Sequence, residues 1–150
     1  DICLCSIDSS SNLIRFAGSK RPLYLVTKKD NFKPINVSNI YSELIQEENS
    51  LYEIKGNNCS IGADDIVFNI EDQVFEYNKG DAIYLSSDGY VDQFGGEDDR
   101  KFKSKRLKNI LLSIQDKSMS EQKETLAQEF QNWKGDKEQI DDATIVGVKL

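Results

Sequence analysis

The sequence predicts an α+β sandwich. The first half of the 150-residue chain carries short runs of β-branched and aromatic residues separated by turn residues, a pattern typical of strands. The second half carries two amphipathic helical patterns, and a final strand-like run covers residues 143–150. A group of strands followed by two adjacent helices and a return strand is expected to pack in layers around one core.

The first part of the chain is expected to be mostly strands. Residues 2–7, 13–17 and 23–26 are separated by Ser-rich and Gly/Pro-containing breaks, which predicts an antiparallel meander. Residues 27–37 are polar and predict a loop. A short helix is expected next, with Ser38 or Asn39 as its cap and with Ile40, Leu44 and Ile45 on one face.

Further strands are expected before the sequence changes character. Residues 51–54 predict a short strand, and residues 66–70 and 74–77 predict a hairpin. Residues 82–86 form a nearly continuous apolar run, which is typical of a strand buried on both faces.

Two helices are expected in the second half. The first has apolar residues at helical spacing, namely Leu107, Ile110, Leu111 and Ile114. The second begins with a capping box formed by Ser118 and Glu121 and should end at Gly135. Its predicted apolar face consists of Met119, Leu126, Phe130 and Trp133.

Composition and charge exclude several functions. The chain holds 26 acidic and 19 basic residues, a formal net charge of −7, and such a surface repels nucleic-acid phosphates and anionic lipids. It contains no histidine, which excludes Ser-His-Asp and Cys-His catalysis. Cys3, Cys5 and Cys59 show no disulfide framework, as is typical of a reducing compartment. We expect a cytoplasmic protein with carboxylate chemistry, no nucleic-acid partner and no direct membrane contact.

The beginning of the chain indicates a piece of a longer protein. Asp1 leads directly into the apolar run 2–7, as if a strand were already under way. Natural domains seldom begin in the middle of a strand. We therefore expect residues 1–150 to be the C-terminal portion of one domain.

Two acidic segments stand beside strong strands. Asp88-Gly89 follows the apolar strand of the first half, and Asp141-Asp142 precedes the closing strand. Carboxylate oxygens are the natural ligands of magnesium and manganese, so these segments favour a divalent cation. Each segment also has a structural explanation, because Asp-Gly is a common turn pair and paired aspartates can cap a turn.

Several short motifs occur in a fixed order along the chain. Ser86-Ser87-Asp88-Gly89 follows a Gly-Asp-x-x-Tyr strand, and Asp141-Asp142-Ala143-Thr144 follows the two helices. The other motifs are Phe16-Ala17-Gly18 with Pro22-Leu23-Tyr24-Leu25, Ser60-Ile61-Gly62, Asp92-Gln93-Phe94-Gly95-Gly96 with Lys101-Phe102-Lys103, and Trp133-Lys134-Gly135 with Gln139. In this order they resemble the sporulation-protein-E-type (SpoIIE-like) branch of the metal-dependent protein phosphatases, the PPM or type 2C family.

The resemblance implies an α-β-β-α sandwich with a two-metal phosphatase site. In that family, manganese or magnesium ions activate a hydroxide that attacks phosphoserine or phosphothreonine directly. Carried over by motif, Asp88 and Asp141 are metal ligands, Asp142 stands beside the metal shell and Gly89 forms the turn at the metal, while no catalytic side chain is assigned. The implied partner is a phosphorylated regulatory protein in bacterial signalling, and a sensor or regulatory domain is expected N-terminal in the parent chain.

The sequence also departs from the family pattern. The family's first metal-binding strand, whose aspartate bridges the two metals, has no counterpart here, so the expected fold is incomplete at its N-terminus and the fragment is expected to be inactive. Ala17-Gly18-Ser19 stands where the family commonly has Ala-Gly-His. Two alternatives remain: a non-catalytic regulatory binding module with the same fold, and a calcium- or magnesium-stabilised sandwich unrelated to phosphatases.

Overall fold

The computed structural model describes residues 1–38, 40–59, 61–62, 70 and 72–150. Its strands are β1 (Ile2–Asp8), β2 (Leu13–Ser19), β3 (Leu23–Lys28), β4 (Lys33–Asn36), β5 (Ile40–Gln46), β6 (Asn49–Ile54), β7 (Gln73–Glu76), β8 (Ala82–Ser86), β9 (Phe94–Gly95), β10 (Arg100–Lys101) and β11 (Ile145–Lys149). Its helices are α1 (Gly89–Asp92), α2 (Ser104–Ser113) and α3 (Met119–Lys134).

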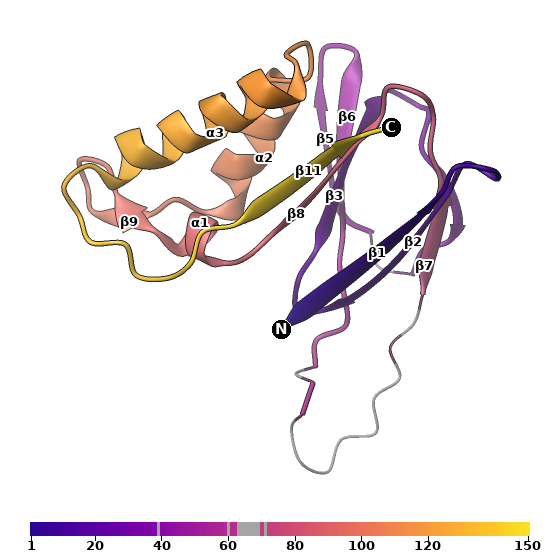
Figure 1. The fold of residues 1–150 in the computed structure, drawn as a ribbon, viewed down its shortest axis with the longest axis horizontal. Coiled ribbons are helices and arrows are strands. Elements are labelled where there is room, and N and C mark those ends of the chain that lie inside the picture. Colours follow the sequence, from indigo (N-terminus) through magenta and orange to yellow (C-terminus); the bar gives the residue numbers. More distant parts are fainter. Residues whose placement is uncertain (39, 60, 63–69, 71) are drawn as a thin grey trace.

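Two large antiparallel sheets and one helical layer make up most of the described fold, and β9 and β10 form a separate two-stranded sheet. The first sheet has the strand order β1-β2-β7-β4, and the second has the order β11-β8-β3-β6-β5. Figure 1 shows α2 and α3 together on one side of the second sheet, with the first sheet on its other side. The second sheet is therefore the central layer of the described part of the chain, and the α+β sandwich expected from the sequence is confirmed.

An apolar core fills the space between the two sheets. Alternate residues of β3 face it, because successive side chains of a strand point to opposite faces. Its buried members are Ile14, Phe16, Leu23, Leu25, Tyr52, Ile54, Phe75 and Ile83. Cys3 and Cys5 pack against this core from the edge strand β1 and are free thiols.

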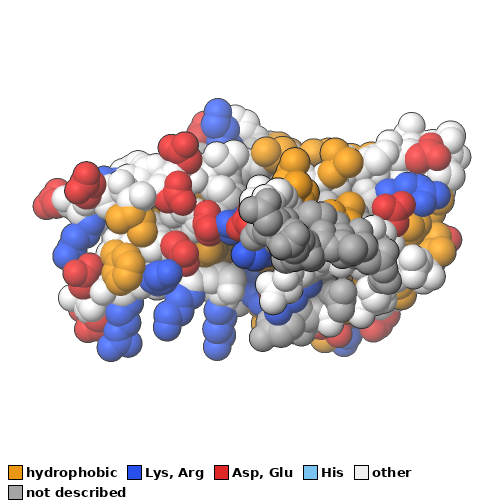
Figure 2. Space-filling view, turned by 90° about the horizontal axis from the view of Figure 1, so that it is seen from below, with side chains coloured by type: hydrophobic (Ala, Val, Ile, Leu, Met, Phe, Trp, Pro, Cys, Tyr) orange, Lys and Arg blue, Asp and Glu red, His pale blue; other side chains and the backbone are white. Residues whose placement is uncertain are grey.

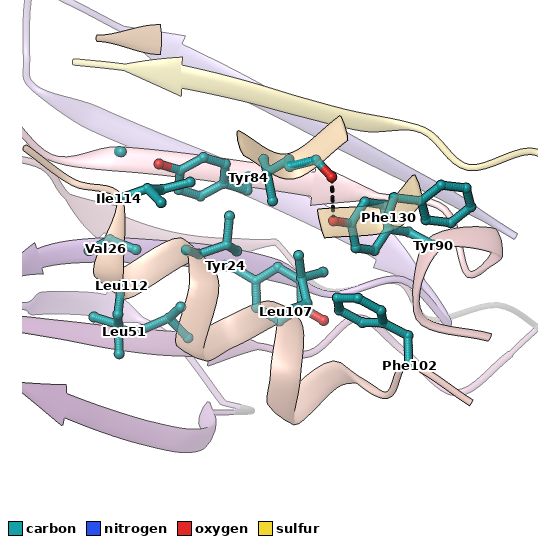
Figure 3. Packing of buried hydrophobic residues seen from close by; sticks show 13 residues of the cluster. Tyr24, Val26, Leu51, Tyr84, Tyr90, Phe102, Leu107, Leu112, Ile114 and Phe130 are labelled. Atoms are coloured by element: carbon teal, nitrogen blue, oxygen red, sulfur yellow. Dashed lines mark hydrogen bonds between the residues drawn. The ribbon is translucent and has the colours of Figure 1, made fainter. Parts of the chain in front are cut away.

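A second core lies between the central sheet and the helices. Figure 3 shows Tyr24, Tyr84 and Leu107 filling the space between sheet and helices. The phenol of Tyr84 donates to Oε1 of Gln122 at 2.6 Å and accepts from Nε2 of Gln115 at 2.8 Å. These hydrogen bonds satisfy a polar group that would otherwise be costly to bury. They also connect the central sheet to both helical segments.

Helix α3 begins and ends where its sequence predicts. The Ser118 side chain accepts from the backbone N of Glu121, the Glu121 carboxylate accepts from the backbone N of Ser118, and the capping box is complete. Gly135 is the C-terminal cap and has φ 54°, a left-handed conformation that favours glycine. Phe130 is buried, so the apolar stripe faces the core as expected.

The loop after α1 is attached to the end of α3. Gly96 donates its backbone N–H to the Trp133 carbonyl at 2.9 Å, and the Trp133 indole donates to the Gln93 carbonyl at 3.1 Å. A Cβ on Gly95 would collide with the Trp133 carbonyl. Two of the segments that carry the family resemblance therefore meet in space. Trp133 itself is half-buried. Cζ of the Arg106 guanidinium lies over its ring, 4.5 Å from the centroid of the Trp133 ring.

The outer face of the first sheet differs from that of the second. Among the described residues, no helix lies on it (Figure 1). Ile2 and Leu4 of β1 point outward and are 56% and 69% exposed. Figure 2 shows a concentration of hydrophobic side chains on this half of the molecule, whereas acidic and basic side chains are more numerous over the helical half. None of the described helices is long and apolar enough to cross a membrane.

One predicted helix is wrong. Residues 40–46 form strand β5, which pairs antiparallel with β6 through contacts such as Leu44 with Leu51. The apolar residues at 40, 44 and 45 fit a helical face. Pairing with the buried strand β6 instead satisfies the backbone hydrogen bonds and packs Leu44 against the core between the central sheet and the helices. Residue 39, the alternative cap, lies outside the described residues.

Other strand predictions are corrected in part. The polar stretch 27–37 contains strand β4 instead of loop alone, and β4 forms the edge of the first sheet. The predicted meander is wrong at its third member, because β3 pairs with β6 and β8 in the other sheet. For the predicted hairpin, residues 66–69 lie outside the described residues, while β7 pairs with β2 and β4. Residues 82–84 of β8 are buried, and Leu85 and Ser86 are half-buried.

Replacing Phe130 tests the helix-side core. Phe130→Ala is expected to lower the free energy of unfolding by about 3–5 kcal/mol, because it leaves a cavity beside Tyr90, whose ring lies 5.0 Å away. Urea unfolding followed by circular dichroism measures the change. Glu124→Ala, at an exposed position of the same helix, is the control and should change stability by no more than about 0.5 kcal/mol. Equal stability of the two variants would contradict the packing of α3.

Candidate functional site

Strand pairing brings the two acidic segments together. Strands β8 and β11 are antiparallel, with Ser86 opposite Ile145, so the end of β8 lies beside the start of β11. The backbone N of Ser87 donates to the Thr144 carbonyl at 3.0 Å. The segment that follows β8 and the segment that precedes β11 therefore leave the sheet at the same edge.

The Ser87 hydroxyl connects these segments further. Its Oγ donates to the Asp142 carbonyl at 2.7 Å and accepts from the backbone N of Thr144 at 2.9 Å. The Ser87 side chain thus hydrogen-bonds the backbone at both ends of the segment from Asp142 to Thr144. The sequence did not single out Ser87 for this role, although a hydroxyl beside a strand end is a common backbone partner.

Gly89 allows the two segments to approach closely. A Cβ at this position would lie 2.5 Å from the Asp142 carbonyl oxygen and 3.0 Å from that of Asp141. Only a residue without a side chain fits there. Gly89 is also the first residue of α1, and Asp88 is its N-terminal cap residue without a side-chain capping hydrogen bond. The Asp88 carboxylate is therefore not a helix cap, although the nearby backbone N–H groups of Asp88 and Gly89 also help to lower its pKa.

Arg21 is a partner of the Asp88 carboxylate. Its Nη2 lies 2.5 Å from Oδ2 of Asp88 and 2.7 Å from Oδ2 of Asp1. The contact follows from strand register: β3 and β8 pair with Leu23 opposite Leu85, which places the loop before β3 beside the loop after β8. Arg21 was not predicted as a site residue. A cation next to Pro22 was visible, but its proximity to Asp88 depends on a pairing of strands that are far apart in the chain.

The guanidinium lowers the pKa of the Asp88 carboxyl. Its hydrogen bond is the main cause that holds the pKa of the Asp88 carboxyl below its usual range. A lowered folded-state pKa means that this contact stabilises the fold above the unfolded-state pKa, and that the contribution is lost as pH falls through the folded-state pKa. The Asp88 side chain is 40% exposed, so solvent screens the contact and keeps its contribution small.

Asp141 and Asp142 lie on the exposed side of this arrangement. The Asp141 carboxylate accepts from the backbone N of Asp142 at 2.7 Å, and the Asp141 carbonyl accepts from Gln139 at 2.8 Å. The segments of Asp88 and Asp141 meet. If both carboxylates bind one octahedral ion or ion pair, they should lie ~5–8 Å apart, and this separation stays a prediction. The described residues contain no group of three or more His, Cys, Asp or Glu that could hold a metal ion.

An open hollow lies beside Asp88. It measures about 450 Å³ and is lined by Asp1, Ile2, Cys3, Arg21, Leu85, Ser86, Ser87, Asp88, Thr144 and Val146. Burial raises the pKa of the Cys3 thiol, so this sulfur is a poor nucleophile at neutral pH. A larger hollow of about 590 Å³ between α3 and β11 is mostly apolar and does not include Asp88. Of the two predicted metal ligands, Asp88 lines the smaller hollow and Asp141 lines neither.

The donor set fits a hard divalent cation. Both acidic segments offer carboxylate oxygens, which magnesium and manganese prefer. With no histidine in the chain, a zinc site built on imidazole is excluded. Asp88 and Asp141 could supply part of an octahedral shell, and Asp142 and Gly89 would fix the backbone beside it.

Comparison with known proteins identifies the class of this fold. The chain is similar in structure to the SiaA-PP2C domain of Pseudomonas aeruginosa, with a TM-score of 0.76 and 25% sequence identity. The match covers 99% of this chain and 50% of that chain, so the present chain spans about half the length of that relative. The fold is that of the type 2C, metal-dependent protein phosphatase class.

The family is identified more closely by sequence. The model of the family described as Stage II sporulation protein E (SpoIIE) matches residues 2–150. The chain belongs to the SpoIIE family, and the resemblance seen in its motifs is confirmed. No curated protein matches the chain significantly.

A methyl group at Gly89 tests the approach of the two acidic segments. Gly89→Ala is expected to lower the free energy of unfolding by about 1–3 kcal/mol, because the backbone at Asp142 must move to admit the new Cβ. Thermal unfolding of the variant and the wild type provides the measurement. An unchanged melting temperature would show that the segments do not pack together in solution.

Proposed function

We propose that residues 1–150 are the C-terminal portion of a metal-dependent serine/threonine protein phosphatase domain. Asp88 and Asp141 are the proposed metal ligands, with Asp142 and Gly89 beside them. The observation that carries this proposal is the junction of the two acidic segments, where Ser87 Oγ donates to the Asp142 carbonyl at 2.7 Å. Membership in the SpoIIE family and the likeness to a type 2C domain support it.

The reaction proposed is hydrolysis of a phosphomonoester. Bound manganese or magnesium would lower the pKa of a coordinated water and neutralise charge on the phosphoryl oxygens. The protein's own residues supply the geometry: Arg21 contacts Oδ2 of Asp88, and Ser87 holds the Asp142 backbone beside Gly89. The chain offers no histidine as a general base, so its part is to bind, orient and bear negative charge.

We propose that the 150-residue chain by itself turns over little or no substrate. A two-metal site needs a ligand that fixes the spacing of both ions. The described residues hold no cluster of three candidate ligands, and the matched type 2C relative has about twice the length of the matched region. The missing ligand would come from a segment that precedes Asp1 in the parent protein.

The proposed substrate is a phosphorylated regulatory protein of a bacterial signalling pathway. A sensor or regulatory domain would precede the phosphatase domain in the parent protein, which we place in the cytoplasm. The acidic surface, with a net charge of −7, favours a protein substrate over nucleic acid. Asp141 is exposed and Asp88 is half-buried, both beside strand ends, where a phosphorylated loop of a partner could reach them.

A second candidate is a non-catalytic binding module with the same fold. The observation that favours it is that the described residues hold no group of three or more side chains that could bind a metal ion. A module of this kind would keep the sandwich and dock a regulatory protein without hydrolysis. The two candidates differ in whether the parent protein has metal-dependent activity.

Turnover of p-nitrophenyl phosphate by the parent protein tests the proposal. The parent is expected to hydrolyse it with manganese or magnesium, whereas the isolated 150-residue chain is not. Asp88→Asn and Asp141→Asn in the parent should each lower kcat by about 100-fold or more without unfolding the protein, because each removes charge from the proposed metal shell.

A neighbouring aspartate serves as the matched control. Asp92 lies on α1 and pairs with Lys101 at 3.2 Å, so Asp92→Asn removes the same charge outside the proposed ligand set and should keep wild-type turnover. A parent that is inert with every metal would favour the binding module. Wild-type turnover by Asp88→Asn or Asp141→Asn would contradict the ligand assignment at that position.

A further inference from the structure

Arg21 contacts the proposed metal ligand in a specific way. Both of its recorded ion pairs use the same nitrogen, Nη2, which lies 2.5 Å from Asp88 Oδ2 and 2.7 Å from Asp1 Oδ2. The Arg21 side chain is only 19% exposed, although it belongs to a loop. Such a guanidinium is constrained on both sides, unlike the long, mobile cations of an ordinary surface ion pair.

The backbone that carries Arg21 is fixed as well. The loop between β2 and β3 is tied to the segment after β6, because Lys20 donates to the Asn57 carbonyl at 2.8 Å and Asn57 donates to the Gly18 carbonyl at 2.7 Å. A Cβ on Gly18 would lie 2.5 Å from the Arg21 carbonyl oxygen. The position of the guanidinium is therefore set by the packing of the loop and not by its charge alone.

The contact uses one oxygen of the Asp88 carboxylate. Nη2 of Arg21 takes Oδ2, and a divalent cation needs only one oxygen of an aspartate ligand. A hydrogen bond to one carboxylate oxygen restricts rotation about the bond that joins the carboxylate to Cβ. It thereby orients the other oxygen, Oδ1, which is the role that outer partners of metal ligands commonly have.

We propose that Arg21 is a positioning residue for the metal centre: it holds Asp88 Oδ2 so that Oδ1 is presented to the divalent cation. This inference rests on the proposed function, since it takes Asp88 as a metal ligand. Arg21 acts through Asp88 and touches neither the cation nor the substrate. Asp1 holds the guanidinium from its other side.

A competing role for Arg21 predicts the opposite change in metal affinity. If Arg21 competed with the cation for Asp88, its removal would tighten metal binding. Loss of a positive charge near a cation site would also tighten binding, because like charges repel. In a folded variant, weaker metal binding after the removal of Arg21 therefore indicates lost orientation of the ligand, and the sign of the change separates the two roles.

Manganese binding to the parent protein provides the test. Free Mn²⁺ is titrated by electron paramagnetic resonance, without any substrate, against the wild type and the Arg21→Met and Arg21→Lys variants. Arg21→Met is expected to weaken Mn²⁺ affinity by about 10–100-fold. Arg21→Lys keeps a charged donor but loses the planar fork, and it should recover part of the affinity.

Arg15→Met is the matched control. Arg15 is an exposed arginine of β2 that pairs with Asp72 at 3.5 Å, away from Asp88. This variant removes the same charge and should bind Mn²⁺ as the wild type does. Circular dichroism checks that each variant is folded, and if Arg21→Met does not fold, the affinity of Arg21→Lys decides, with a several-fold loss expected.

The outcomes separate this inference from the proposed function. Unchanged or tighter Mn²⁺ binding by the Arg21 variants, together with weakened binding by Asp88→Asn, would overturn the positioning role and keep the ligand assignment. Unchanged binding by Asp88→Asn, or no Mn²⁺ binding by the wild type, would overturn the metal site itself. Weakened binding by Asp88→Asn and by both Arg21 variants supports both.

Discussion

The candidate site depends on the position of β8 between β3 and β11. Leu85 lies opposite Leu23 on one side and opposite Val146 on the other. This double pairing brings the loops that carry Arg21, Asp88 and Asp142 to one end of the central sheet. Because side chains alternate along a strand, a shift of one residue in either register would turn the whole strand over. The geometry of the site is therefore fixed by the strand pairing of the core.

Packing on both faces of β8 maintains that register. Ile83 belongs to the core between the sheets, whereas Tyr84 belongs to the core under the helices. The hydrogen bonds of Tyr84 to Gln122 and Gln115 give the helical side a directional contact in addition to apolar burial. A slipped strand would place an aromatic residue between the sheets and leave two buried glutamine side chains without this partner. The helical layer thus supports the site from a distance.

Local sequence patterns predicted most elements of the fold but not all of their partners. The two long helices were predictable because their apolar spacing and the Ser118–Glu121 capping box act within a few residues of the chain. The predicted helix at 38–45 was wrong because its few apolar residues fit more than one period, and pairing with β6 decided the outcome. The sheet to which β3 belongs also escaped prediction, since strand order depends on contacts between distant segments.

By itself, the sequence indicated a candidate chemistry of carboxylate oxygens without histidine, on motifs that place Asp88 and Asp141 beside strands. The sequence determined the family, because the order of short motifs is a property of the chain alone. Only the tertiary structure decided which groups meet. The 67 residues that separate Arg21 from Asp88 are bridged by the pairing of β3 with β8, and Gly89 faces the Asp142 carbonyl because β11 returns beside β8. Such contacts follow from packing and strand register, which no local pattern encodes.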